Sequence, residues 1–344
     1  MNKQIFSFVT VCIIMGLSYP FVRKHTVMSF GGCSRAVNVN QYKIVKERDL
    51  LELINTCSKD GVNLNGGKSN YDYLKRNLKN FNCSQSLRFL SAPRSLVALA
   101  SFPGSGNTWT RQLIETATGY FTGSVYTDWN FVGSNECPSR RRVFIVKTHL
   151  TSNSSTSHRD CTRIYVAHLH FACAICILRN PYSAILAEFN RENSNNARAH
   201  FDPGHWVAPK QMFTTKRWRM FVSKQVNRWK NMALYWIQKN EPTYVLVYER
   251  LLENTFLEMS RLMTFLNITI QYDSLYCLSA DDNRSFKRII PHWMTINNVY
   301  SDELREIVNK AVQTVKIGID SKLNLNGVLN SYFLPIENSS RQMQ

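Results

Sequence analysis

Two adjoining runs of sequence decide the fold of this chain: Ser95-Leu-Val-Ala-Leu-Ala-Ser-Phe102 and then Pro103-Gly-Ser-Gly-Asn-Thr-Trp109. The first run is rich in apolar residues and is stopped by Pro and Gly, and Leu113, Ile114 and Ala117 follow it at helical spacing. This pattern predicts a buried strand, a tight loop and then a helix. Glycines let backbone N–H groups turn inward and a helix N-terminus attracts anions, so the stretch is typical of a phosphate-binding loop.

The loop differs from a Walker A sequence. A Walker A loop ends in Gly-Lys-Ser/Thr, whereas here Gly106 is followed by Asn107, Thr108 and Trp109. A phosphate loop that lacks the lysine and has an indole beside it indicates a nucleotide held by stacking as well as through phosphate. Taken alone, a Gly-Ser-Gly turn also fits a plain tight connection, so the interpretation depends on the rest of the chain.

Length and charge narrow the class of protein. A chain of 344 residues can bury one sizeable α/β core with a flank, or two small domains, and we favour one catalytic domain. The formal net charge of +18 fits polyanionic partners. These include nucleic acid, an anionic membrane surface, a phosphate-rich cosubstrate and a sulfated or sialylated glycan. Charge alone does not choose among them.

The N-terminal residues predict a membrane segment. Ile5 to Val22 contains no charged residue and is long enough to cross a bilayer as a helix. The alternative is a cleavable signal peptide with a cleavage site near Gly16-Leu-Ser18. The basic residues on both sides of the span do not fix its orientation.

Glycosylation sequons and cysteines favour a lumenal location for the rest of the chain. An even set of eight cysteines beyond the span is compatible with disulfides in an oxidising compartment, and Cys137 with Cys161 is the most plausible bridge. Cys173 and Cys176 lie three apart in a predicted strand and face opposite sides, so we expect each to be a core residue or paired elsewhere. The sequons begin at Asn82, Asn153, Asn267, Asn283 and Asn338.

Further strands and helices alternate along the chain. Strands are predicted at Val143–Val146, Ala172–Leu178 and Thr243–Val247, and residues 151–157 are predicted to form only a solvated loop. An amphipathic stretch from Met212 to Gln238 carries an aromatic stripe that we expect to pack in the core, with a substrate platform as the alternative. Strands separated by helices form βαβ units, which predicts a mostly parallel sheet flanked by helices.

In such sheets a ligand binds at the carboxyl ends of the strands. This rule places Gly104, Lys147, His149, Arg179 and Tyr248 on one rim. The Arg179 guanidinium suits a phosphate, although it could also pair with a carboxylate. Lys147 and His149 are two residues apart in an extended segment, so their side chains should point the same way. His149 would be a general base and Lys147 an electrostatic stabiliser beside it. A purely structural histidine is the alternative.

These residues together resemble PAPS-dependent sulfotransferases. Ser101-Phe-Pro-Gly-Ser-Gly-Asn-Thr-Trp109 is similar to their 5′-phosphosulfate loop, and Lys147-Thr-His-Leu150 is similar to their catalytic-histidine motif. Leu178-Arg-Asn-Pro181 resembles their 3′-phosphate motif, and Val245-Leu-Val-Tyr-Glu249 resembles the strand end that contacts the adenosine. The order and spacing match from about residue 90 to 315. The sequences of these motifs look most like those of the membrane-anchored, WSC-domain-containing sialate O-sulfotransferases, but the cysteine-rich WSC modules are missing.

The resemblance implies a role for each motif residue. His149 would take the proton of an acceptor hydroxyl that attacks sulfur, and no metal is expected. Cytosolic relatives have a serine where this chain has Ala187, so Ser183 or Arg191 is expected to compensate. The residues that would bind PAPS are Gly104, Ser105, Gly106, Asn107 and Thr108 for the 5′-phosphosulfate, Trp109 and Tyr248 for adenine, and Arg179, Lys287 and Arg288 for the 3′-phosphate.

Gly104 departs from the cytosolic relatives, which carry a lysine at the equivalent point. Sulfuryl transfer builds negative charge on the leaving phosphate, so we expect Lys147 to supply the missing cation. The alternative is that Lys147 only orients the acceptor or pairs with a carboxylate.

The sequence therefore predicts a single-pass type II Golgi membrane protein that transfers sulfate from PAPS to a glycan or glycoprotein hydroxyl, with sialic acid as one candidate acceptor and without a nucleic-acid partner. Two alternatives are a catalytically silent glycan- or polyanion-binding protein with this fold and, less favoured, a P-loop kinase. The expected segments are a cytoplasmic tail at 1–4, the anchor at 5–22, a lumenal stem at 23–90, the sulfotransferase domain at 91–330 and a C-terminal tail at 331–344.

Overall fold

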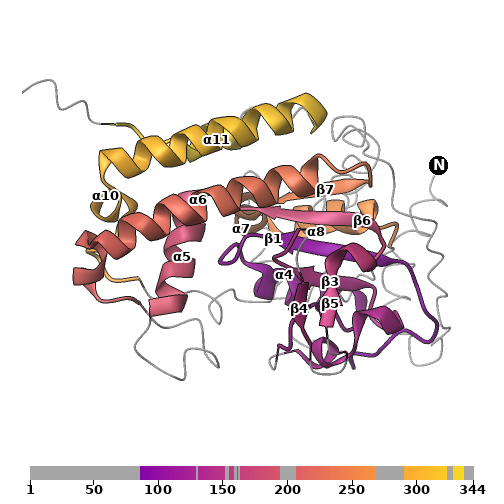
Figure 1. Cartoon of the computed structure of the whole chain (residues 1–344). Helices are drawn as coiled ribbons and strands as arrows, with labels where there is room; N and C mark the ends of the chain where they lie inside the picture. Colours follow the sequence, from indigo (N-terminus) through magenta and orange to yellow (C-terminus); the bar gives the residue numbers. More distant parts are fainter. Residues whose placement is uncertain are drawn as a thin grey trace, which may run out of the picture.

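A parallel β-sheet forms the centre of the computed structural model, which describes residues 86–128, 131–151, 155–158, 161, 163–193, 207–268, 290–323 and 328–336 (Figure 1). The strand order is β2-β3-β1-β6-β7, and every neighbouring pair in it is parallel. The predicted α/β fold is confirmed. The strands are β1 (Leu96–Ser101), β2 (Gly123–Ser124), β3 (Ile145–Thr148), β6 (Phe171–Leu178) and β7 (Thr243–Val247).

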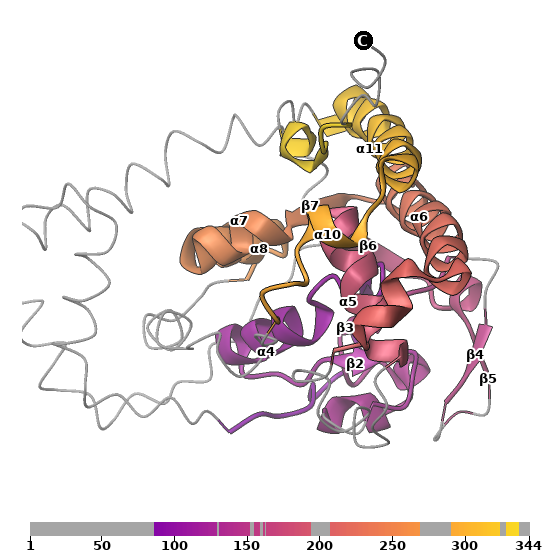
Figure 2. The same cartoon turned by 90° about the vertical axis from the view of Figure 1, so that its left-hand side faces the viewer.

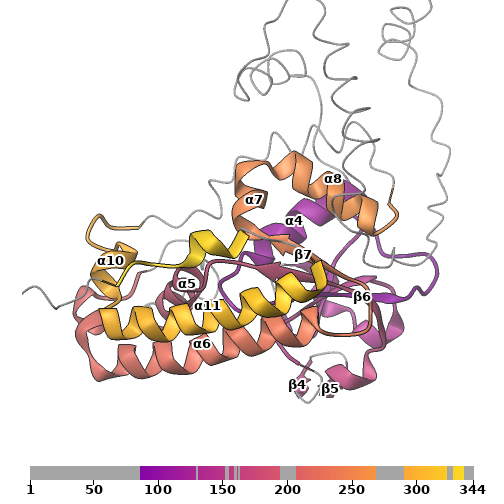
Figure 3. The ribbon, with the colours of Figure 1, turned by 90° about the horizontal axis from the view of Figure 1, so that it is seen from above.

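Helices cover both faces of this sheet, as Figures 2 and 3 show from two directions. One face carries α4 (Asn107–Thr118), α7 (Tyr248–Glu253) and α8 (Thr255–Phe265). The other face carries α5 (Pro181–Asn193), α6 (Lys216–Ile237) and α11 (Asp302–Leu323). The shorter elements are the β4–β5 hairpin (Ser155–Ser157 with Arg163–Tyr165), α10 (Ile296–Val299) and 3-10 turns at Val132–Asn135, Pro138–Arg140, Val166–His168, Lys210–Thr214 and Val328–Tyr332.

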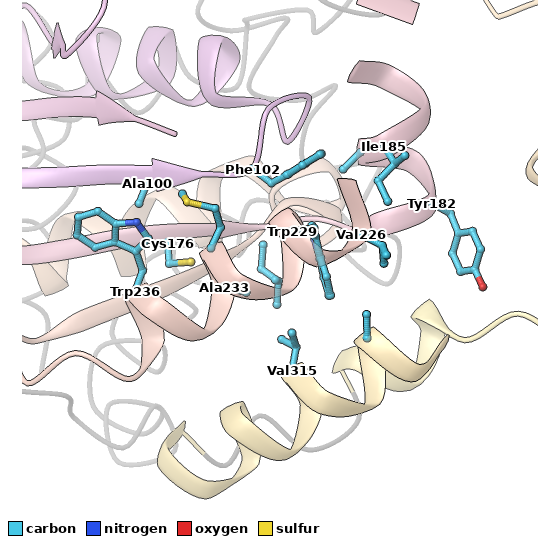
Figure 4. Packing of buried hydrophobic residues seen from close by; sticks show 14 of the residues in the cluster. Ala100, Phe102, Cys176, Tyr182, Ile185, Val226, Trp229, Ala233, Trp236 and Val315 are labelled. Carbon is cyan, nitrogen blue, oxygen red and sulfur yellow. The ribbon is translucent and has the colours of Figure 1, made fainter. Parts of the chain in front are cut away.

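Side-chain size fits α6 to the sheet. Strand residues alternate between two faces, and β1 presents small side chains such as Ala100 to α6. Ala100 and Cys176 leave room for the indoles of Trp229 and Trp236, which are both buried (Figure 4). The aromatic stripe of α6 is therefore core packing, as predicted.

Two predictions about local structure are corrected. The strand expected at Val143–Val146 begins two residues later, at Ile145, although Val143 is still buried. Ser155–Ser157, expected in a solvated loop, forms β4 because its backbone pairs antiparallel with β5. Polar side chains hid this pairing, since a small exposed hairpin needs no apolar alternation.

Several predicted features lie outside the described residues. They are the anchor at 5–22, the tail at 1–4, the stem up to residue 85, the sequons at 82, 153, 283 and 338, and Lys287 with Arg288. Within the described ranges, none of the helices is both long enough and apolar enough to span a bilayer.

Candidate functional site: a phosphate-type loop beside a polarised histidine

The loop between β1 and α4 depends on two glycines. Gly104 and Gly106 have φ angles of 77° and 87°, in the left-handed region that favours glycine. A Cβ on Gly104 would lie 2.6 Å from the carbonyl oxygen of Ala184, and one on Gly106 would collide with the Tyr248 ring. The loop is thus pressed between α5 and the start of α7, and no larger residue fits at either position.

The N-terminus of α4 has free donors. Gly106 caps the helix without a side-chain hydrogen bond, and its carbonyl accepts from Thr110 N at 3.0 Å. Within the described part of the chain, the N–H groups of Gly106, Asn107, Thr108 and Trp109 have no carbonyl acceptor. Four unpaired amides at the positive end of a helix form an anion site.

The side chains of the loop have different surroundings. The Ser105 hydroxyl is buried and has no hydrogen-bond partner. Asn107 ties the loop to β1, because its Nδ2 donates to Leu99 O at 3.2 Å and to Ser101 Oγ at 3.1 Å. Thr108 is half-buried at the first turn of α4. The Asn107 side chain is therefore a structural brace, and its contribution to anion binding would come from its backbone.

Arg179, which follows β6, lies against the same loop. Its Nη1 donates to Gly104 O at 2.6 Å, and its guanidinium carbon lies 4.3 Å from the centre of the Tyr248 ring. Its buried Nε has no hydrogen-bond partner. Trp109 meets Tyr248 edge-on, with ring centres 5.9 Å apart, but is itself buried. The rings and the guanidinium gather at one point, and Tyr248 is the less buried of the two rings. Their adenine and 3′-phosphate roles stay predictions.

Glu249 is a positioning residue that the sequence reasoning missed. Its Oε1 accepts from Asn180 N at 2.9 Å, directly after Arg179, and its Oε2 accepts from the Tyr332 hydroxyl. This carboxylate joins the ends of β6 and β7 to the last 3-10 turn. Its position directly after Tyr248 at a strand end was the available signal.

His149, directly after β3, has a defined tautomer. Its Nδ1 lies 2.7 Å from Ser101 O and 3.2 Å from Ser101 Oγ. Because a backbone carbonyl can only accept, Nδ1 must carry the proton and Nε2 keeps its lone pair. Tyr126 stacks on the imidazole with ring centres 5.7 Å apart, and its hydroxyl accepts from His149 N at 3.1 Å. Tyr126 lies in an irregular segment and was not predicted.

The surroundings of His149 keep it neutral. Burial, followed by the charge of Lys147, lowers its pKa to about 3, and Arg228 and Arg191 add to this effect. The hydrogen bond to Ser101 O opposes it. The imidazole is therefore neutral at physiological pH with a free Nε2, and a pKa this low makes it a weak base until the charges around it change.

Lys147 is held by a carboxylate. Its Nζ lies 3.0 Å from Asp128 Oδ2, which also receives Arg111 Nη1 at 3.1 Å. The fully buried Arg111 donates further to Thr122 and Ser134, so it points away from the loop. Burial lowers the pKa of Lys147, although Asp128 opposes this. This ion pair matches the alternative in which Lys147 pairs with a carboxylate. A contribution of Lys147 to catalysis stays a prediction.

The predicted disulfide between Cys137 and Cys161 is confirmed, and it closes the segment that carries β3 and His149. Cys176 is a free, buried thiol, and Cys173 is disulfide-bonded. The two therefore do not share a site, as their opposite orientation in the strand predicted.

Comparisons with known proteins place the chain in a family. A "WSCD family member" of Drosophila pseudoobscura pseudoobscura is 34% identical over 209 residues, covering 58% of this chain and 59% of the relative. A second one, of Drosophila melanogaster, is 34% identical over 204 residues, covering 56% and 57%. The chain thus matches less than two thirds of these relatives' length.

Among solved structures, a mouse sulfotransferase complexed with PAP is 16% identical, with a TM-score of 0.42, covering 71% of this chain and 88% of that one. A retinol dehydratase in complex with retinol and PAP is 13% identical, with a TM-score of 0.33, covering 73% and 86%. The family assignment depends on sequence instead. Residues 94–298, more than half of the chain, match the family described as "Sulfotransferase domain". This chain is therefore a member of the sulfotransferase domain family.

Proposed function

We propose that this family member transfers the sulfuryl group of PAPS to a hydroxyl of an acceptor, with His149 as general base. The observation that carries the proposal is the contact of His149 Nδ1 with Ser101 O, because it leaves Nε2 free. Ser101 also accepts from Asn107, which connects the histidine directly to the phosphate-type loop. A base and an anion site on one short segment suit attack of a hydroxyl on a phosphate-linked sulfur.

The residues present fit the donor. The free amides at residues 106–109 and the unpaired Ser105 hydroxyl would hold the 5′-phosphosulfate. The unpaired Nε of Arg179 would bind the 3′-phosphate, and Tyr248 would stack on adenine. PAPS supplies the sulfuryl group and leaves as 3′,5′-ADP.

In this reaction the acceptor oxygen forms the new bond to sulfur while the bond from sulfur to the 5′-phosphate oxygen breaks. The acceptor proton goes to Nε2 of His149. Because Nδ1–H stays on Ser101 O, the imidazole keeps its orientation as it becomes charged. The negative donor would offset the surrounding cations and raise the pKa of His149 towards the working pH.

For the acceptor we propose a glycan or glycoprotein in the Golgi lumen, with sialic acid as one candidate. The apolar N-terminal run, the sequons and the net charge of +18 support this assignment. The Cys137–Cys161 disulfide supports an oxidising compartment.

A nucleotide-binding experiment tests the donor assignment. The thermal midpoint of the full-length protein should rise with 3′,5′-ADP and much less with 5′-AMP, since only the former carries a 3′-phosphate. Arg179→Ala should remove the difference between the two nucleotides. Equal shifts for both nucleotides with the unmutated protein would refute the 3′-phosphate site.

A further inference from the structure

α6 lies along the rim of the candidate site. Trp229 Nε1 donates to Arg179 O at 3.0 Å, and Trp236 Nε1 donates to Leu150 O at 3.3 Å, one residue after His149. These two bonds fix the helix between the nucleotide side and the histidine side of the site. Arg228 directly precedes Trp229 and is exposed.

Arg228 differs from the other cations near His149. Lys147 is paired with Asp128, and Arg191 donates to both oxygens of Glu188 at 2.7 Å. Among the described residues, Arg228 forms neither an ion pair nor a hydrogen bond. It still lies close enough for its charge to lower the pKa of His149. Arg228 is therefore a cation on the histidine side of the site that a ligand can reach.

Two more cations continue from Arg228 along the helix. Arg217, Lys224 and Arg228 are spaced by seven and four residues, which places them on one stripe of α6 over about 16 Å. All three are exposed, and they form no ion pair within the described ranges. The 22 residues of α6 include no Asp or Glu. We call Arg217, Lys224 and Arg228 the α6 basic track.

The track faces away from α11. Lys216 and Arg219 lie on another side of α6, where they line a shallow hollow with Glu303 at the start of α11. Phe221, in the middle of the track, packs on Phe189 of α5 with ring centres 5.0 Å apart. Because the half-buried Phe221 is engaged in this packing, the described part of the track offers mainly charge, which favours an acidic glycan over a single-stranded nucleic acid that needs stacking platforms.

We propose that the α6 basic track binds an extended acidic glycan, with Arg228 holding the anionic group nearest the hydroxyl that reacts at His149. This inference rests on the proposed function and makes it more specific. Carboxylate and sulfate groups share the chemistry that an arginine fork recognises. Arg228 is then the specificity-determining residue, and Lys224 with Arg217 binds anions further along the chain.

The test measures binding of fluorescent oligosaccharides to the full-length protein in the presence of 3′,5′-ADP. The probes are a sialic acid trimer, a longer chondroitin sulfate oligosaccharide, a neutral chitin oligosaccharide and a single-stranded oligonucleotide. Arg228→Ala should weaken both acidic probes about 10- to 100-fold, as expected for a lost charge-assisted hydrogen bond. Arg228→Lys should retain part of the affinity.

A matched pair of double variants tests the length of the track. Arg217→Ala with Lys224→Ala should weaken the longer acidic probe more than the trimer. Lys216→Ala with Arg219→Ala removes the same residue types from another side of α6 and should change neither probe.

Three results would overturn the inference: equal binding of neutral and acidic probes, equal losses in the two double variants, or tighter binding of the oligonucleotide. The nucleotide response is recorded on the same samples. If the protein binds acidic glycans but shows no response to 3′,5′-ADP, the proposed function is refuted, whereas glycan binding by the α6 basic track is not.

Discussion

At the scale of single residues, three features define the orientation and the charge of His149. Its Nδ1 is fixed on Ser101 O, its ring stacks on Tyr126, and its pKa is lowered to about 3 by burial and by Lys147. The histidine should therefore stay neutral through the range in which an ordinary histidine titrates. Binding of an anionic nucleotide should raise this pKa, because negative charge favours the imidazolium.

NMR titration of the His149 imidazole in the full-length protein checks this prediction. Without nucleotide, its chemical shifts should not change between about pH 8 and pH 5, the range over which a free histidine gains its proton. With 3′,5′-ADP the midpoint should move upward. A midpoint near 6.5 without nucleotide would contradict the described environment.

Gly104 provides the second prediction at this scale. Its φ of 77° and the nearby Ala184 carbonyl leave no room for a Cβ. Gly104→Ala should lower the free energy of unfolding by about 1–3 kcal/mol or more, from backbone strain and steric overlap. Gly104→Lys should fail to supply the cation found in cytosolic relatives for the same reason. Urea denaturation measures the loss, with Gly119→Ala, also at positive φ, as the control for strain alone.

At the scale of elements, a partly buried carboxylate joins α4 to β3. Asp128 pairs with Arg111 and with Lys147, and the Arg111 side chain is fully buried. Removing this carboxylate leaves the buried guanidinium without its ion-pair partner, with only the nearby Glu115 as counter-charge. Asp128→Asn should therefore lower the free energy of unfolding by about 3–5 kcal/mol.

The chain offers a control for this experiment in Glu136, whose partners Arg140 and Arg142 are exposed by 57% and 53%. Although Glu136 itself is buried, Glu136→Gln should lower the free energy of unfolding by only about 0–1 kcal/mol, because both arginines stay solvated when its charge is removed. Similar losses of unfolding free energy in the two variants would show that burial of Arg111 does not make its pair with Asp128 more important for stability.

The same elements show what Lys147 can contribute to catalysis. Since its ammonium is shared with Asp128, it can supply charge at the leaving group only in part. If it does so, Lys147→Met should lower kcat about 10²–10³-fold with little change in the KM for PAPS. An unchanged kcat would assign Lys147 to structural pairing alone.

The sequence was informative where regular structure constrains position. Parallel strands place their carboxyl ends on one edge, so the loop at Gly104, His149, Arg179 and Tyr248 could be placed together, and they are. Tyr126 and Asp128 could not be predicted, because they lie in an irregular segment that only tertiary packing brings against β3.

α11 was missed for a different reason. Its buried residues recur every three or four positions, a pattern that predicts a helix, but the segment contains no catalytic or phosphate-binding motif. They are Leu304, Val308, Val312, Val315 and Ile319.

At the scale of the whole molecule, this member of the sulfotransferase domain family carries its candidate site at one edge of the sheet. The phosphate-type loop, Arg179 and Tyr248 form the nucleotide side, and His149 with the α6 basic track forms the acceptor side. The nucleotide side can be tested by binding alone. The central claim, that the chain transfers sulfate with His149 as base, needs turnover.

Transfer of labelled sulfate from PAPS to a panel of sialylated, sulfated and neutral glycans tests this claim most directly, with His149→Gln beside the unmutated protein. The unmutated protein should label at least one glycan, and His149→Gln should lower the rate about 10²–10⁴-fold while the affinity for 3′,5′-ADP stays within a few-fold. A variant with near-normal turnover would contradict His149 as the base. Nucleotide binding without transfer to any glycan of the panel would contradict the assigned activity.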